Sequence, residues 1–442
     1  GVALGGAAQD FVILCGSMRR DGKSLGQMAR EEVGAIGGWI ALLGVFAIIV
    51  ILIAVLAMVV VIALADSPWG VVTIALTVPI ALLMGAWMRW IRPGKVLEAS
   101  AIGLVLLALA LWAGEVVHQL PKDSDLRRHF VIDKESLGWA VIFYGFLASV
   151  LPVWLLLTPR DYLSAFVKLG TVVLLAIGIF ITLPDLRMPA LVSQFDPGGP
   201  FANGNGPVGP GTLFPFAFIT IACGAISGFH ALVSSGTTPK MLAKETDARP
   251  VGYGSMLMES FVAVLALIAA CALTPGVYFA MNAPSAKIGT DIATAAATIS
   301  QWGFTVAPEE LREISEQIGE PILSKTGGAP TLAVGMAKIF SNVFRGPMDW
   351  WYHFAIMFEA LFILTTIDAG TRVGRFILQD LVGQVWTRFG NLSWTPAAWT
   401  ASAVVAGGWG YFLIAGIRDP FGGIYTLWPV FGIANQVLAA IA

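Results

Sequence analysis

The stretch "ISGFHALVSSGTTPKM", residues 226–241, places polar and helix-loosening residues directly after the apolar run "LFPFAFITIACGA". An ionisable side chain inside an apolar span is costly and is by default a functional candidate, so His230 stands out. Two interpretations fit: His230 forms a hydrogen bond between packed helices, or it belongs to a polar site at membrane depth. In the second, Gly224 and Gly228 mark a broken helix whose freed backbone groups line a cavity.

The end of this stretch has a simpler explanation. Gly236 stops a helix, and Pro239 followed by Lys240 opens a loop, but this does not account for His230 several residues earlier. If the stretch binds a substrate, these polar and small residues would form the site: Gly224, Ser227, Gly228, His230, Ser234, Ser235, Thr237 and Lys240. A carboxylate substrate fits Lys240, the hydroxyl cluster and a positive helix end, and a peptide C-terminus fits them equally well.

Ionisable residues inside apolar segments are also candidates for carrying a coupling proton, and they are Glu359, Glu259, His230 and Asp10. Glu359 follows Trp350 by nine residues, which places it about 13 Å into its helix at ~1.5 Å per residue. That depth is near the middle of a hydrocarbon core about 30 Å thick, where burial disfavours the charged carboxylate. The alternative is a neutral Glu359 that hydrogen-bonds a neighbouring helix.

Other polar residues have structural explanations. Asp368 stands four residues before Arg372, so it is predicted to form an i,i+4 surface pair. Asn435 and Gln436 are expected to hydrogen-bond across helices. The three cysteines, Cys15, Cys223 and Cys271, lie in apolar runs without metal-ligand or redox spacing, which predicts reduced, buried thiols. No catalytic residue, metal site or cofactor is predicted.

These residues belong to a strongly apolar chain. Of its 442 residues, 57% are hydrophobic and 12% are charged, with a mean hydropathy of +0.79. Ordinary soluble domains carry about 25% charge. The apolar residues form long blocks, and about 20 such residues cross a bilayer. The chain is therefore predicted to be an all-α polytopic membrane protein with the lipid bilayer as its partner. Its net charge of −2 gives no support to nucleic-acid binding.

Eleven hydrophobic segments are predicted within a single transmembrane domain, residues 1–442. The segments are 1–17, 36–65, 69–91, 97–117, 138–157, 162–183, 213–235, 254–280, 350–370, 398–416 and 424–442. Because the chain begins without Met and stops inside an apolar segment, we expect a fragment of a longer protein, truncated at both ends.

Lys and Arg in the loops predict the orientation. They place Lys244 in the cytoplasm and Asn205 outside, although the loop 118–136 disagrees with four basic residues of its own. Residues 282–349 are then an extracytoplasmic loop. Pro308 and Gly319 bracket a short amphipathic helix in it. "TGGAPTLAVGMAKIF" follows, too short and interrupted to span, and is expected to be re-entrant or interfacial.

Several long motifs resemble the carbon starvation protein A family of bacterial inner-membrane transporters. In chain order they are "GGAAQDFVILCGSMRRDGKSLG", "ISGFHALVSSGTTPKM", "DARPVGYGSMLMES", "TGGAPTLAVGMA", "DAGTRVGRF" and "LWPVFGIANQ". The resemblance implies a core like that of the amino acid–polyamine–organocation transporters, two inverted repeats with broken helices. It also implies multi-pass insertion in the inner membrane and uptake of pyruvate with protons, or of peptides. It carries over no site residues.

Two other classes of function are alternatives to transport. A membrane-embedded enzyme would be expected to show HExxH, GxSxG or GxGD, and the sequence shows none of these patterns. A sensor or structural membrane protein does not require deep acids beside a polar helix break. The sequence therefore favours a transporter over an enzyme. It leaves open pyruvate against peptide, proton against sodium, and the oligomeric state.

Overall fold

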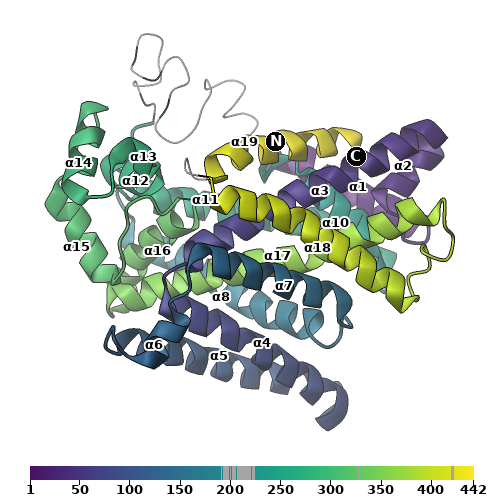
Figure 1. Ribbon diagram of the computed structural model, residues 1–442, viewed down its shortest axis with the longest axis horizontal. Coiled ribbons are helices and arrows are strands. Elements are labelled where there is room, and N and C mark those ends of the chain that lie inside the picture. The colour runs from purple at the N-terminus through teal and green to yellow at the C-terminus, as the bar shows by residue number, and fades with distance from the viewer. Residues whose placement is uncertain are drawn as a thin grey trace.

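A computed structural model describes residues 1–442 except 191, 193–198, 200, 202–205, 207–220, 222–223, 327 and 420–422. Within the described residues every regular element is a helix (Figure 1), so the predicted all-α class is confirmed. Cys223, Asn205 and residues 213–220 and 222 of the predicted segment 213–235 lie outside the described residues.

The helices fall on either side of the long gap between residues 191 and 223. Those before it are η1 (Val2–Gly6), α1 (Ala7–Met18), α2 (Leu25–Val33), α3 (Ala35–Leu64), α4 (Pro68–Ala86), η2 (Trp87–Ile91), α5 (Val96–Gln119), α6 (Asp125–Phe130), α7 (Lys134–Val150) and α8 (Leu157–Thr182). Those after it are α10 (Gly228–Gly236), η5 (Thr238–Lys240), η6 (Glu245–Asp247), η7 (Arg249–Gly254), α11 (Ser255–Cys271), α12 (Pro275–Asn282), α13 (Ser285–Ile288), α14 (Ile292–Gln301), α15 (Pro308–Ile318), α16 (Ala329–Phe344), α17 (Met348–Gly383), α18 (Thr395–Ile417) and α19 (Gly423–Ile441).

Helices α3 and α17 form the centre of the molecule. The α3 sequence is apolar on all sides, and a helix of that kind must be buried. It packs against α17, α2, α19 and α18, while α17 also contacts α16, α7 and α8. The core therefore consists of side chains from helices far apart in the chain, and the functional groups described below are attached to this frame.

Seven helices among the described residues are long and apolar enough to cross a membrane. They are Ile36–Leu64, Pro68–Ile91, Val96–Gln119, Leu157–Thr182, Glu245–Cys271, Met348–Gly383 and Thr395–Arg418, and each overlaps a predicted segment. Two shorter apolar helices, Val2–Met18 and Thr426–Ile441, coincide with the predicted first and last segments. The predicted segment 138–157 corresponds to α7, which has 17 residues.

Helices α12 to α15 gather at one end of the molecule, at the left of Figure 1. α15 begins at Pro308 and ends at Ile318, and Gly319 takes a left-handed conformation with φ of +74°. These are the boundaries that the sequence predicts for the amphipathic helix. The next helix, α16, has 16 residues and is largely buried against α17, α8 and α11. The Asn282 amide donates to Thr331 Oγ1 at 2.8 Å, which ties α12 to α16.

Candidate functional site

A break in helical structure precedes α10. Gly224 and Ala225 are helical, Ile226 and Ser227 are not, and α10 begins at Gly228. The Ser227 hydroxyl accepts the His230 backbone N–H at 3.4 Å, so Ser227 caps the new helix. α10 ends at Gly236, as predicted, and the break before Gly228 agrees with the broken-helix interpretation, one of the two that the sequence left open.

Asn435 of α19 holds this break in place. Its Oδ1 accepts the Phe229 backbone N–H at 2.9 Å and the Ser227 hydroxyl at 3.4 Å. Gly228 lies so close to α19 that a Cβ atom there would stand 2.3 Å from the Asn435 carbonyl oxygen. Glycine is thus required at position 228 for close contact between the two helices, and Asn435 bonds across helices as predicted.

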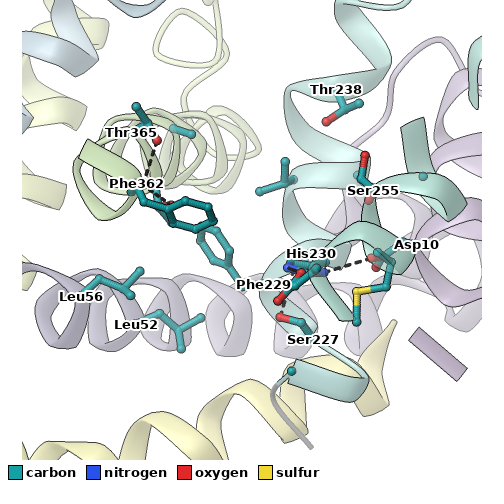
Figure 2. Close-up of a pocket in the computed structure, with 18 of the residues that line it drawn as sticks. Asp10, Leu52, Leu56, Ser227, Phe229, His230, Thr238, Ser255, Phe362 and Thr365 are labelled. Carbon is teal, nitrogen blue, oxygen red and sulfur yellow. Dashed lines mark hydrogen bonds and ion pairs between the residues drawn. The ribbon is translucent and has the colours of Figure 1, made fainter. Parts of the chain in front are cut away.

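His230 lies between two carboxylates from different helices. Its Nδ1 is 3.0 Å from Asp10 Oδ2 of α1, and its Nε2 is 3.2 Å from Glu259 Oε2 of α11. Figure 2 shows the contact between His230 and Asp10. The Asp10 side chain is 7% exposed and that of Glu259 is 42% exposed, so Glu259 is the more accessible carboxylate. We call these three residues the His230 triad.

Small residues and π-helical turns bring the triad together. α1 and α11 are each preceded by a π-helical turn, η1 and η7, a feature that is frequent at functional sites. A Cβ on Gly6 would stand 2.2 Å from the Ala225 carbonyl oxygen, and one on Gly252 would stand 2.9 Å from Phe11 Cα. Glycine at both positions therefore lets α1 approach the broken segment and η7.

The hydrogen bonding of the triad requires an extra proton. A neutral imidazole has one N–H donor and one acceptor nitrogen, whereas an ionised carboxylate only accepts. Both imidazole–carboxylate hydrogen bonds can form in two ways. Either His230 is an imidazolium that donates from both nitrogens, or one carboxyl group is protonated and donates to the imidazole. The triad can thus hold a proton and pass it between three positions at hydrogen-bond distance.

The triad lines one side of a cavity of about 600 Å³. The predicted residues on its lining are Asp10, Gly224, Ser227, His230, Ser234 and Glu259. Those off its lining are Gly228, Ser235, Thr237, Lys240 and Glu359. Sequence reasoning thus located one wall of the cavity.

Two of the residues away from the lining have packing contacts instead. The Ser235 hydroxyl accepts the Leu25 backbone N–H at 3.1 Å and donates to the Ala231 carbonyl at 2.8 Å, which joins α10 to α2. Lys240 Nζ lies 4.9 Å from the centre of the Phe376 ring. The side chain of Glu359, within α17, forms no hydrogen bond or ion pair with any other residue that the structure describes.

The other wall of the cavity contains residues that sequence reasoning missed. Asp161 and Lys168 of α8 line it, together with Phe362 and Thr365 of α17. Figure 2 shows Phe362 and Thr365 across the cavity from His230 and Asp10. A signal existed in the sequence, because Lys168 is a cation inside the predicted span 162–183.

The prediction for Asp368 is wrong. Asp368 is fully buried, where it accepts the Tyr144 hydroxyl at 2.5 Å and pairs with Arg160 at 3.4 Å. Arg372 instead donates to the carbonyl oxygens of Ala148 and Leu151. The turn of α17 that carries Asp368 faces α7 and α8, so its partners come from those helices and not from its own.

The cysteine prediction holds in part. Cys15 and Cys271 are free thiols, as predicted, but both are only partly buried.

A helical bundle with several candidate membrane spans and an internal cavity lined by ionisable groups is typical of polytopic membrane proteins that move small molecules. The sequence model described as carbon starvation protein CstA matches residues 1–442, and the chain belongs to that family. The resemblance drawn from the motifs is therefore confirmed.

Individual relatives align over the whole chain. The peptide transporter CstA of Helicobacter pylori is 56% identical over 445 residues, and that of Escherichia coli is 55% identical over 450. The pyruvate/proton symporter BtsT of Escherichia coli is 51% identical over 466 residues. The alignments cover 100% of this chain and 63%, 63% and 64% of these relatives, so the chain spans less than two thirds of their length.

Proposed function

We propose that the protein containing this chain is a secondary active transporter that takes up pyruvate or small peptides together with protons. The names of the relatives support both substrates, and the BtsT name supports the proton. The observation that carries the proposal is the His230 triad on the wall of an internal cavity, beside a helix break. The proposal makes this protein a carrier in the bacterial inner membrane and not an enzyme.

Charge explains how the triad could couple a proton to an anionic substrate. With a neutral His230 and two ionised carboxylates the triad carries two negative charges, and a bound proton reduces this to one. Because Coulomb repulsion is strong where water is scarce, an anion enters the cavity more favourably once the proton is bound. Favourable coupling of this kind is reciprocal, so the bound anion also retains the proton.

The proposed architecture places this site at a repeat interface. We propose eleven membrane segments with an inverted-repeat core, and residues 282–349 as an extracytoplasmic region with α16 as its re-entrant or interfacial part. The break before α10 supports this, because transporters of that kind build midplane sites from discontinuous helices. The inward and outward states would then differ by movement around the break.

Glu359 is the second candidate for the proton site. It lies on α17 away from the cavity lining, and its side chain has no hydrogen-bonding partner among the described residues. A proton held there could not act directly on a substrate in the cavity. The triad touches the cavity and offers three exchange positions, so the geometry favours the triad.

The test is uptake by the full-length protein in proteoliposomes. Labelled pyruvate and a labelled dipeptide are offered separately under an imposed pH gradient or sodium gradient. The proposal predicts accumulation of at least one substrate when the outside is acidic, and loss of that accumulation when a protonophore is added. A requirement for sodium with no effect of the protonophore would remove the proton claim. Uptake of neither substrate would remove the transport claim.

A further inference from the structure

Lys168 holds an unusual position for a lysine inside a membrane span. Its Nζ donates to Thr365 Oγ1 at 2.9 Å and lies 4.6 Å from the centre of the Phe362 ring. The Thr365 hydroxyl itself donates to the Phe362 carbonyl at 2.8 Å, which leaves a lone pair free for the lysine. One turn of α17 therefore fixes the ammonium group at the cavity wall.

The charge on Lys168 is not neutralised by a close ion pair. In the described part of the chain, no carboxylate oxygen lies within the ion-pair distance of 4.0 Å from its Nζ. Asp161 shares its face of α8 seven residues earlier, about 10 Å along the helix axis. An ammonium group can donate three hydrogen bonds, and among the described residues only Thr365 accepts one of them. A half-buried cation therefore has donors to spare at the cavity.

The neighbouring arginine shows how the same helix treats a structural cation. Arg160 is 1% exposed, pairs with Asp368 at 3.4 Å and lies over the Tyr144 ring at 4.7 Å. Its charge is compensated by fixed groups away from the cavity. Lys168 has no carboxylate within ion-pair distance among the described residues, and it lines the cavity instead.

The two walls of the cavity then differ in charge. Asp10 and Glu259 make the His230 wall acidic. The opposite wall carries Asp161 as well, but it also presents the ammonium group of Lys168, which Thr365 holds in place. A carboxylate is repelled by Asp10 and Glu259 on the first wall and finds a cationic donor at Lys168 on the second. Because of this difference, the carboxylate of a bound molecule is expected at the Lys168 wall.

We infer that Lys168, oriented by Thr365, binds the carboxylate of the transported substrate, whether that is the carboxylate of pyruvate or the C-terminus of a peptide. The inference rests on the proposed function and deepens it. The Phe362 ring covers the Lys168 ammonium group, and the Thr365 hydroxyl fixes its orientation. Thr365 is therefore a positioning residue. The body of the substrate then extends toward the His230 triad.

The experiment compares Lys168→Met with wild type in the full-length protein. It measures KM and the maximal rate for labelled pyruvate and for a labelled dipeptide. It also compares how strongly unlabelled pyruvate and unlabelled methyl pyruvate, the neutral ester, inhibit that uptake. Loss of one charge-assisted hydrogen bond should raise KM about 10- to 100-fold for the substrate that is carried. The variant should also lose the preference for the acid over the ester, which a merely structural lysine would not affect.

Two further variants make the result decisive. Lys338→Met removes a partly buried lysine from α16 that does not line the cavity, and it should keep the wild-type KM and preference. Thr365→Val should raise KM about 3- to 10-fold with the preference weakened, and it decides the question if Lys168→Met does not fold.

The outcomes separate this inference from the proposed function. A wild-type protein that transports, with Lys168→Met or Thr365→Val unchanged in KM and preference, overturns the inference and leaves transport intact. A wild-type protein that is stabilised against heat by pyruvate through Lys168, yet carries neither substrate, overturns transport and supports the inference. A wild-type protein that neither binds nor carries a carboxylate overturns both.

Discussion

The His230 imidazole contacts a carboxylate on each of its nitrogens, and this decides which substitutions are informative. We predict that His230→Ala and His230→Gln both reduce proton-driven uptake by about 100-fold or more, since each removes a positioned proton-transfer group. Uptake in proteoliposomes is the measurement, with size-exclusion behaviour as the check on folding. If glutamine retained most of the activity, His230 would be only a hydrogen bond between helices, and near-normal uptake in both variants would exclude it from the site.

A second ionisable cluster lies in the region between α15 and α17. Glu320 is 7% exposed, pairs with Lys325, and lies 3.8 Å from His353 Nε2. Burial alone would raise the pKa of Glu320, but Lys325 and His353 outweigh it and hold that pKa below its usual 4.5. A depressed pKa in the folded state stabilises the fold above about pH 4.5, and this contribution is lost as the pH falls through the folded-state value.

Glu320→Gln should therefore destabilise the protein at neutral pH by about 3–5 kcal/mol, the usual result of breaking one side of a buried pair. The deficit should shrink when the pH falls below about 4.5. Thermal unfolding of both proteins in detergent at several pH values measures it. A deficit that is constant with pH would show that the Glu320 carboxylate is not the source of the stability.

At the scale of residues, the sequence identified individual groups but not their partners. Asp10, His230 and Glu259 were predicted because ionisable residues in apolar runs stand out. Asp10 and His230 are 220 residues apart in sequence, so their contact depends on helix packing that no local pattern encodes. The prediction for Asp368 was wrong for the same reason. Arg372, four residues away, is a plausible partner in the sequence, but the actual partners, Tyr144 and Arg160, lie on α7 and α8.

Among the contacts between helices, the one between α10 and α19 is expected to be the most sensitive to mutation. A Cβ at Gly228 would meet backbone atoms at 2.3 and 2.5 Å, from Asn435 and Ala439, and backbone cannot rotate away. Gly228→Ala should therefore cost about 1–3 kcal/mol of stability and displace the helix break, with loss of uptake. Gly44→Ala is the matched control, because a Cβ there has no atom within 4 Å. Equal melting temperatures for the two variants would contradict the close contact.

Elements were predicted best where a single physical requirement defines them. Length and apolarity located the seven long helices, and Pro308 and Gly319 set the limits of α15. The π-helical turns η1 and η7 were not predicted, because they depend on the approach of α1 to its neighbours and leave no periodic pattern. The far wall of the cavity was not predicted, although Lys168 is an ionisable residue within the predicted span 162–183.

Orientation in the membrane is a property of the whole molecule. The distribution of Lys and Arg predicts that Lys244 is cytoplasmic and that Asn205, which lies outside the described residues, is extracytoplasmic. Cysteines introduced at the two positions should differ in intact cells, with an impermeant thiol reagent labelling position 205 alone. Equal labelling at both positions would mean that an even number of membrane crossings separates them.

The central claim is that substrate and proton move together through the His230 triad. The most direct test adds pyruvate outside proteoliposomes without an imposed gradient and follows the internal pH, with protein-free vesicles as the control. The wild-type full-length protein should acidify the interior as pyruvate enters. Glu259→Gln should still exchange labelled pyruvate but move no protons, and Glu359→Gln should behave as wild type. Pyruvate entry through the wild-type protein without acidification, or full acidification by Glu259→Gln, would contradict the account.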